Sequence, residues 1–185
     1  MGSRHFFPTA PEMITACIGL GSNLGDSHQI LQDAWNDLVS RERIEPVALS
    51  SPFRSEPVDM ESEHWFVNAA ALIRTSLPAH ELLQLLLDIE ALFGRLRDGS
   101  PGHQDRTLDL DLLLYGDLVL SSDRLTLPHP QMHSRGFVLE PLAEITPGTV
   151  HPILGLDIRT LCELLRSRPD QPLVERISWQ RLPDH

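Results

Sequence analysis

Two aspartates, Asp109 and Asp111, interrupt an apolar run and are the residues whose type and spacing most clearly suggest chemistry. A strand alternates its faces with a period of two, so both carboxylates should project from one face, opposite the leucines at 108, 110 and 112. Such positions lie roughly 6.5–7 Å apart, and two carboxylates can jointly hold a pair of hard cations about 3.5–4 Å apart. Unpaired acids on an apolar strand are costly, so we expect a positive group over them. Spacing alone equally allows an edge strand with two solvated aspartates.

Arginine supplies all of the chain's 15 Lys and Arg residues, because the sequence contains no lysine. A Walker A loop, a kinase-type lysine and a Schiff-base mechanism are therefore excluded, and any phosphate must be bound by guanidinium groups. Arginines gather in sequence around the aspartate pair, although ordinary surface arginines would look the same. These residues are Arg95, Arg97, Arg106, Arg124 and Arg135.

Composition limits the other classes of function. The formal net charge of −11 argues against a nucleic-acid backbone or an anionic membrane as partner. With 185 residues, 41% of them hydrophobic, the chain has the size of one soluble domain. We expect residues 1–12 to be a short leader or cloning remnant and residues 13–185 to form that domain. Cys17 and Cys162 have no metal or redox spacing, which favours a reducing cytoplasm.

Hydrophobic periodicity and turn residues predict the elements that position these side chains. The glycines of 19–25 resemble a dinucleotide fingerprint, but the third comes one residue late, so we predict a tight loop with Asp26 or Ser27 as a helix N-cap. The order strand–helix–strand–strand–helix–strand predicts an α+β, ferredoxin-like (split βαβ) fold, with helices on one face of a largely antiparallel sheet and the other face open. We predict strands at 13–20, 44–53, 66–73, 107–114, 125–127 and 174–179, and helices at 27–38, 78–93, 137–145 and 157–166.

Six motifs in order carry a family resemblance: 21–25, 50–55, 66–70, 106–111, 127–129 and 135–142. Together they resemble the 6-hydroxymethyl-7,8-dihydropterin pyrophosphokinases of folate biosynthesis, from about Met13 to Ile145 and more loosely to residue 166. The resemblance implies transfer of the β,γ-pyrophosphoryl group of ATP to the pterin hydroxymethyl group, release of AMP, and two Mg²⁺ ions. It implies small-molecule partners only, no nucleic acid or membrane, a cytoplasmic location, and a monomer or weak homodimer.

The resemblance also assigns roles to residues. Asp109 and Asp111 match the metal-binding pair and, with Arg95 and Arg106, the catalytic group. The pterin-binding positions, which supply aromatic faces, a ring-edge amide and loop contacts, are Ser55, Pro57, Val58, Phe66, Asn68 and Phe137. The remaining matched positions hold ATP or line its site, and they are Glu90, Arg97, Arg124, Thr126, His129 and Arg135.

These roles make physical sense. A flat heteroaromatic ring needs aromatic faces and a side chain that can both donate and accept hydrogen bonds. Phosphoryl transfer needs positioning and charge neutralisation, so we expect no dedicated strong general base. The loop at 98–105, flanked by arginines, is suited to close over ATP.

The chain departs from the family's usual pattern at three places. His103-Gln104-Asp105 replaces an aromatic and a Gly-Pro or Ala-Pro pair, so that Asp105 adds a negative charge where phosphates are expected. Leu87 replaces a glutamine that some members place near adenine, and Pro130 replaces a common aromatic.

Each residue taken singly also has an ordinary structural interpretation. Asn68 could hydrogen-bond a neighbouring loop, Phe66 and Phe137 could be core residues, and Glu90 could be a solvated helix residue. His129 and His133 have metal-like spacing, but the flanking prolines argue against a helix and hence a zinc site. Two other functions stay open: a different two-metal nucleotidyl or phosphoryl transferase, and a non-catalytic ligand-binding domain of the same fold.

Overall fold

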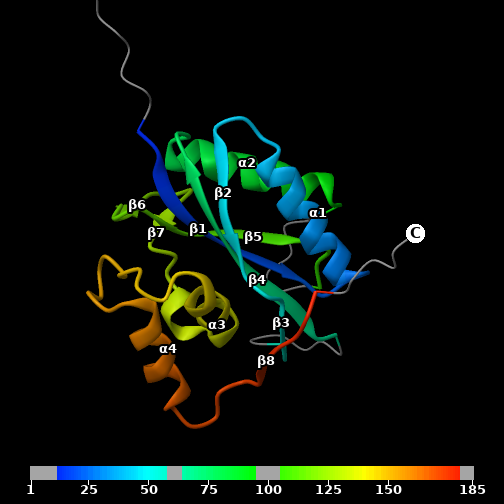
Figure 1. Ribbon diagram of the computed structural model, residues 1–185, viewed down its shortest axis with the longest axis vertical. Coiled ribbons are helices and arrows are strands. Elements are labelled where there is room, and N and C mark those ends of the chain that lie inside the picture. Colours follow the sequence, from blue (N-terminus) through cyan, green and yellow to red (C-terminus); the bar gives the residue numbers. More distant parts are fainter. Residues whose placement is uncertain (1–11, 58–63, 95–104, 180–185) are drawn as a thin grey trace, which may run out of the picture.

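An antiparallel sheet is the centre of the computed structural model, which describes residues 12–57, 64–94 and 105–179 (Figure 1). Within these residues the strands follow the order β5-β1-β4-β3-β8, and β2 also pairs with β4. The elements up to the last long strand are β1 (Ile14–Ser22), α1 (Ser27–Val39), β2 (Ile44–Leu49), β3 (Phe53–Ser55), β4 (Phe66–Thr75), α2 (Ala79–Leu92) and β5 (Asp109–Tyr115). They are followed by β6 (Leu120–Ser121), β7 (Thr126–Leu127), a 3-10 turn (Met132–Ser134), α3 (Gly136–Ile145), α4 (Ile158–Arg166) and β8 (Val174–Arg176).

The topology confirms the predicted ferredoxin-like arrangement. β4 lies between β1 and β2, the two strands that α1 connects, which is the split βαβ pattern. β1 pairs antiparallel with β4 on one side and with β5 on the other. This register places Gly21 between Asn68 and Asp109 across three neighbouring strands.

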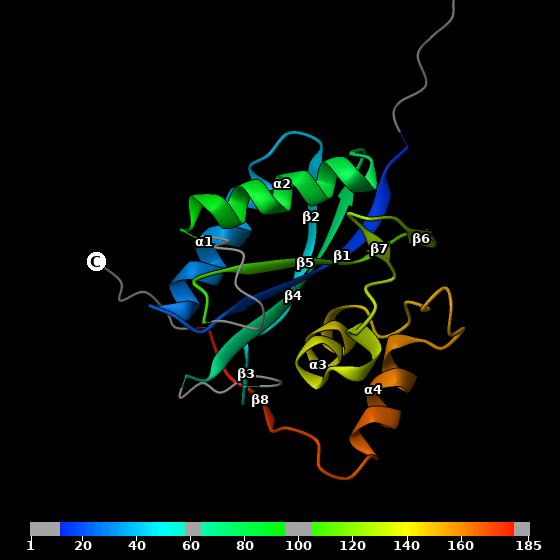
Figure 2. The same cartoon turned by 180° about the vertical axis from the view of Figure 1, so that it is seen from behind.

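Helices cover both faces of the sheet, so the prediction of one open face is wrong (Figures 1 and 2). Leucines of α1 and α2 pack with Ile18, Ile73 and Leu110 on one face. On the other face, Leu139 and Leu142 of α3 pack with Cys17 and other core residues, together with apolar residues of α4. Each fully buried leucine contributes about 1.5–3 kcal/mol, which favours docking α3 on the sheet. Any site on that face must therefore lie beside α3.

The predicted strand at 44–53 is in fact two strands, β2 and β3. Ser50 interrupts them because its side chain, as well as its backbone, bonds β4: Ser50 N–H donates to Ala70 O at 2.9 Å, and Ala70 N–H donates to Ser50 Oγ at 2.9 Å. Pro52 follows and cannot donate a hydrogen bond to a ladder. The predicted first residues of β5, Thr107 and Leu108, precede that strand, and β8 ends at Arg176.

Other local predictions are confirmed. Asp26 caps α1 by accepting a hydrogen bond from Gln29 N–H at 3.1 Å, and Pro78 stands at the start of α2.

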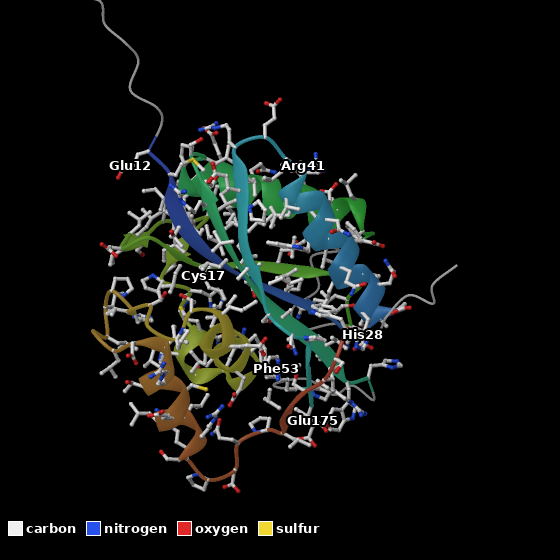
Figure 3. The ribbon with its side chains drawn as sticks, in the orientation of Figure 1. Glu12, Cys17, His28, Arg41, Phe53 and Glu175 are labelled. Carbon is white, nitrogen blue, oxygen red and sulfur yellow. The ribbon has the colours of Figure 1, made fainter. Side chains whose placement is uncertain are left out.

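Cys17 lies between the sheet and α3 (Figure 3), where burial raises its pKa to about 12; burial likewise raises the pKa of Cys162 to about 11. Both free thiols are thus protonated at neutral pH. Among the described residues, no helix has the length and apolar character needed to cross a membrane.

Candidate active site

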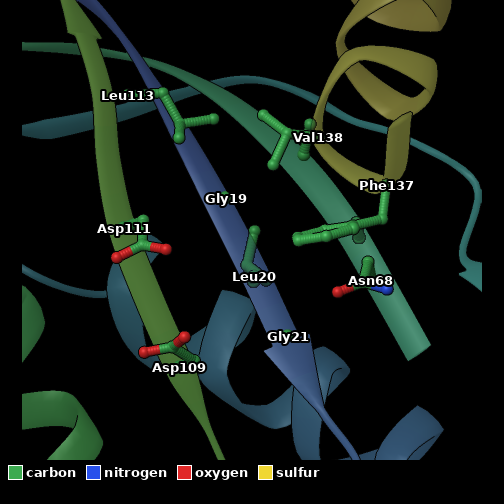
Figure 4. Close-up of a pocket in the computed structure, with 11 residues that line it drawn as sticks. Gly19, Leu20, Gly21, Asn68, Asp109, Asp111, Leu113, Phe137 and Val138 are labelled. Carbon is green, nitrogen blue, oxygen red and sulfur yellow. The ribbon is translucent and has the colours of Figure 1, made fainter. Parts of the chain in front are cut away.

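Strand β5 presents Asp109 and Asp111 on one face, as the alternation predicts (Figure 4). Both aspartates are half-buried, whereas Leu108, Leu110 and Leu112 are buried in the opposite core. The expected positive group is present at Asp109, because Arg106 Nη1 lies 2.6 Å from Asp109 Oδ2. Their side chains are only 16% and 21% exposed, so this charge-assisted contact is partly shielded from water.

Asn23, at the end of β1, fixes the backbone that carries Arg106. Its Oδ1 accepts a hydrogen bond from Arg106 N–H at 2.8 Å, and its own N–H donates to Arg106 O at 3.1 Å. Its Nδ2 donates to Asp105 Oδ1 at 2.6 Å. Asp105, unusual for its charge, is therefore tied to the end of β1. Asn23 was not among the residues predicted for the site, and its only signal in the sequence is an asparagine in the glycine-rich turn.

Glu90 stabilises the strand that carries the two aspartates. It is buried in α2, and its Oε1 accepts a hydrogen bond from Leu110 N–H at 2.7 Å. Leu110 lies between the two aspartates on β5. This strand pairs with β1 on one side and is the end strand of the sheet. Glu90 thus bonds the backbone that presents the pair. It lines neither of the cavities described below, and it is not the solvated residue that the helical pattern allowed.

A first cavity, here called the β1 pocket, has a volume of about 360 Å³, which includes space open to solvent, and lies between β5 and the start of α3 (Figure 4). Asn68 Nδ2 donates to Ser55 Oγ at 2.9 Å, and both residues are buried. The Oδ1 atom of Asn68 points toward Gly21, and Phe137 extends from α3 over the sheet nearby. The pocket is lined by Gly19, Leu20, Gly21, Asn68, Ala69, Ala70, Asp109, Asp111, Leu113, Phe137 and Val138.

Glycines leave the floor of the β1 pocket bare. A Cβ atom on Gly21 would lie 3.2 Å from Asn68 Oδ1 and 3.9 Å from Asp109 Cβ. A Cβ on Gly19 would meet a methyl group of Leu113 at 3.4 Å. The absence of side chains at these two positions allows a flat group to approach the β1 backbone. This role of the two glycines was not predicted from the sequence, where they form only an incomplete dinucleotide fingerprint.

A second cavity, here called the hairpin cleft, has a volume of about 820 Å³, which includes space open to solvent, and lies between α2, β5 and the β6–β7 hairpin. Its polar lining includes Arg124, Thr126 and His129, three of the positions predicted for ATP, and Leu87 and Pro130 also contribute. Asp111 lines both this cleft and the β1 pocket. One carboxylate therefore stands at the boundary of two cavities.

His129 is held in its neutral form. Burial lowers its pKa, and the nearby Arg135 lowers it further, while Asp109 acts in the opposite direction. Its backbone N–H donates to Leu113 O at 2.9 Å, which fixes the hairpin beside β5. Gln131 N–H donates to its Nδ1 at 3.3 Å, which assigns the ring proton to Nε2.

The remaining predicted residues are only partly brought together. The Arg135 guanidinium lies 5.6 Å from the centre of the Phe137 ring, and Arg135 also donates to Gln131 Oε1. Phe66 is half-buried and does not line the β1 pocket. Pro57 is the last residue described before a gap. The other predicted positions lie outside the described residues, and these are Val58, Arg95, Arg97 and the loop at 98–104.

The aspartate pair has the donors that Mg²⁺ prefers. Mg²⁺ is usually held by one or two carboxylates, with substrate phosphates and water completing its octahedron. In the described part of the chain, no group of three or more His, Cys, Asp or Glu residues is placed to hold a metal ion by itself. Two half-buried carboxylates beside a cleft fit a cation that arrives with a phosphate ligand.

The sequence profile of one family, described as 7,8-dihydro-6-hydroxymethylpterin-pyrophosphokinase, matches residues 17–147. The chain belongs to this family. The resemblance seen in the motifs is thereby confirmed, and all of the aspartate, asparagine and histidine positions discussed above fall within the matched range.

Curated relatives named 2-amino-4-hydroxy-6-hydroxymethyldihydropteridine pyrophosphokinase agree. The protein of Methylorubrum extorquens is 43% identical over 138 residues, covering 75% of this chain and 86% of the relative. The protein of Synechocystis is 46% identical over 148 residues, covering 80% and 74%. The protein of Haemophilus influenzae is 38% identical over 163 residues, covering 88% and 98%.

Solved structures show the same fold. The Plasmodium falciparum HPPK-DHPS wild type with SDX-DHP superposes with a TM-score of 0.67 at 13% sequence identity. The match covers 83% of this chain and 44% of that one. The chain therefore spans less than half the length of this structural neighbour, and the likeness concerns the fold alone.

Proposed function

We propose that this protein transfers the β,γ-pyrophosphoryl group of ATP to the hydroxymethyl group of 6-hydroxymethyl-7,8-dihydropterin and releases AMP, as a step of folate biosynthesis. Family membership and the names of the relatives support the proposal. The observation that carries it is the position of Asp111, which lines both the β1 pocket and the hairpin cleft. A transfer between two bound molecules needs its phosphate-neutralising groups at such a boundary.

We assign the pterin to the β1 pocket. Asn68 is buried with its Nδ2 bonded to Ser55, so its Oδ1 is oriented to accept a hydrogen bond from the edge of the ring. Phe137 supplies an aromatic face, and Gly19 and Gly21 allow the ring to lie close to β1. Phe66 as the second aromatic face, and Pro57 and Val58 as backbone contacts, remain assignments from the family resemblance.

ATP fits the hairpin cleft. Arg124, Thr126 and His129 line it, and Arg135 lies close enough to His129 to affect its pKa. Neutral His129 would donate from Nε2 to a phosphate oxygen. Arg95 and Arg97 join this group by resemblance. Glu90, placed beside ATP by the same resemblance, accepts a hydrogen bond from Leu110 N–H and would act through it as a positioning residue.

Asp109 and Asp111 would hold the two Mg²⁺ ions, which neutralise the phosphate oxygens when bound. The pterin hydroxyl oxygen forms a bond to the β-phosphorus, the bond from that phosphorus to the α,β-bridging oxygen breaks, and AMP leaves. The hydroxyl proton passes to solvent, because no strong base is required for this substitution. Arg106, which pairs with Asp109, would neutralise charge on the transferring group. The protein's contribution is alignment and exclusion of water.

Incubation with ATP, MgCl₂ and the hydroxymethyl pterin tests the proposal. AMP and the pterin diphosphate, separated by ion-exchange chromatography, should appear in equal amounts, and AMP should not appear without pterin. The Asp111→Asn variant is the matched negative control. Turnover only with another hydroxyl acceptor would indicate a different phosphoryl transferase, and pterin binding without turnover would indicate a ligand-binding domain.

A further inference from the structure

Strand β8 lies beyond residues 17–147, the range that matches the family profile, yet it is bonded to the site. It pairs antiparallel with β3, so that Phe53 faces Arg176 and Ser55 faces Val174 (Figure 2). Backbone bonds continue on both sides of this pairing. Ile177 N–H donates to Pro52 O at 2.9 Å, and Glu56 N–H donates to Leu173 O at 3.4 Å.

β3 is the strand that orients Asn68. Its Ser55 accepts the hydrogen bond from Asn68 Nδ2, and both side chains are almost fully buried, at 1% and 5% exposure. β3 has only three residues and pairs with β4 on its other side. A strand this short depends on its neighbours for a defined position. β8 therefore fixes the residue that sets the direction of the Asn68 amide.

β8 also holds the opposite wall of the pocket. A methyl carbon of Val174 lies 3.3 Å from the Cβ position of Gly136, directly before Phe137. Arg176 links α3 to the residues that precede β3: its Nε lies 3.0 Å from Glu144 Oε2 on α3, and its Nη2 donates to Ser51 Oγ at 2.9 Å. Ser51 N–H donates to Glu144 Oε1 at 2.8 Å, which completes the bridge.

The end of the segment is anchored independently of the site. Trp179 Nε1 donates to Ser50 O at 3.1 Å, and the indole ring meets the edge of His28 on α1 with a ring-centre separation of 6.3 Å. Trp179 and Ile177 also pack against the core between the sheet and α1. Residues 173–179, here called the C-terminal strap, are thus tied to the core at one end and to both pocket walls in the middle.

We propose that the C-terminal strap is a positioning element of the β1 pocket, which sets the affinity for the pterin but not for the nucleotide. The inference rests on the proposed function for the identity of the ligand. The strap contacts β3, which carries Ser55, the hydrogen-bond partner of Asn68, and α3, which carries Phe137. None of the described residues that line the hairpin cleft belongs to β3, α3 or the strap.

Arg176→Ala and Val174→Ala test the proposal, with Glu175→Ala as the matched control at an exposed position of the same strand. KM for pterin and for ATP is measured from AMP release, alongside the thermal unfolding midpoint. We expect the pterin KM to rise about five- to tenfold in each test variant, since a pocket that is less well ordered loses more conformational entropy on binding. The ATP KM should stay within about twofold, and Glu175→Ala should resemble the wild type.

A strap that serves stability alone would lower the unfolding midpoint and leave both KM values unchanged. That result, or an equal rise of both KM values, would overturn the proposal. A chain ending at Asp170 is the stronger variant, and if it does not fold the two point variants decide. A wild type that releases no AMP with pterin refutes the proposed function instead. Fluorescence titration of the variants with pterin then shows independently whether the strap shapes this pocket.

Discussion

The β1 pocket and the hairpin cleft differ in how firmly their polar groups are held. In the pocket, the Asn68 amide is buried and bonded to a buried serine, and the floor is backbone. In the wider cleft, Arg124 and Thr126 are exposed, and the Arg124 guanidinium donates to Gln84 Oε1 at 3.0 Å. A group already held in place loses little conformational entropy on binding. The polar groups of the pocket are thus preorganised, whereas Arg124 and Thr126 in the cleft stand in solvent and would lose more conformational entropy on binding.

Loss of the shared carboxylate should have the largest effect, because Asp111 borders both cavities. We expect Asp111→Asn to lower kcat about a thousandfold or more while the circular dichroism spectrum is unchanged, since the phosphate-neutralising metal would be lost. Asp117→Asn, at an exposed turn after β5, is the control. A near-normal rate in Asp111→Asn would contradict the claim that the carboxylate shared by the two cavities is needed for transfer.

Filling the pocket floor should come next. We expect Gly21→Ala to raise the pterin KM roughly ten- to a hundredfold, because its Cβ would lie 3.2 Å from Asn68 Oδ1. The ATP KM should change little. Gly148→Ala is the matched control, because no atom lies within 4 Å of its Cβ position. If Gly21→Ala affected ATP as strongly as pterin, the floor would not belong to the pocket alone.

Removing the ring-edge amide should have an effect in the same range as filling the pocket floor. We expect Asn68→Ala to weaken pterin binding by about 1–3 kcal/mol, since polar ring groups would be left unpaired. Calorimetric titration with each ligand measures this. Ser55→Ala, which removes only the partner that orients the amide, should lose less. Comparable losses for pterin and ATP would contradict the assignment of Asn68 to the pocket.

The smallest effect should be that of His129 protonation on the free energy of unfolding. Burial lowers the pKa of His129 in the folded protein, so the unfolded chain binds a proton first as the pH falls. The free energy of unfolding should therefore decrease below about pH 6.5, the unfolded value, and level off below the folded pKa. Urea unfolding of the wild type and His129→Gln at pH 7.5 and 5.5 checks this. An equal loss in both proteins would show that His129 does not contribute.

Local patterns were sufficient for much of the fold and for the aspartate pair. A period of two placed Asp109 and Asp111 on one face, and the order of elements predicted the split βαβ topology. The aspartate spacing and the pattern of each element can be read from short stretches of the chain, so no knowledge of distant partners was required.

Distant contacts explain what could not be predicted. Glu90 bonds the backbone 20 residues away, and Asn23 bonds Arg106 at a separation of 83 residues. Helical periodicity identified α3 but not the face of the sheet that it covers, because docking depends on packing with α4 and the strands. The break between β2 and β3 depends on the Ser50 hydroxyl meeting Ala70 across the sheet.

The most direct test of the central claim is a crystal structure with Mg²⁺ and a non-hydrolysable ATP analogue. We predict cations that contact both the Asp109 and Asp111 carboxylates, with the phosphates reaching them from the hairpin cleft. Cations bound elsewhere, with Asp109 still paired to Arg106 and Asp111 coordinating none, would contradict the account.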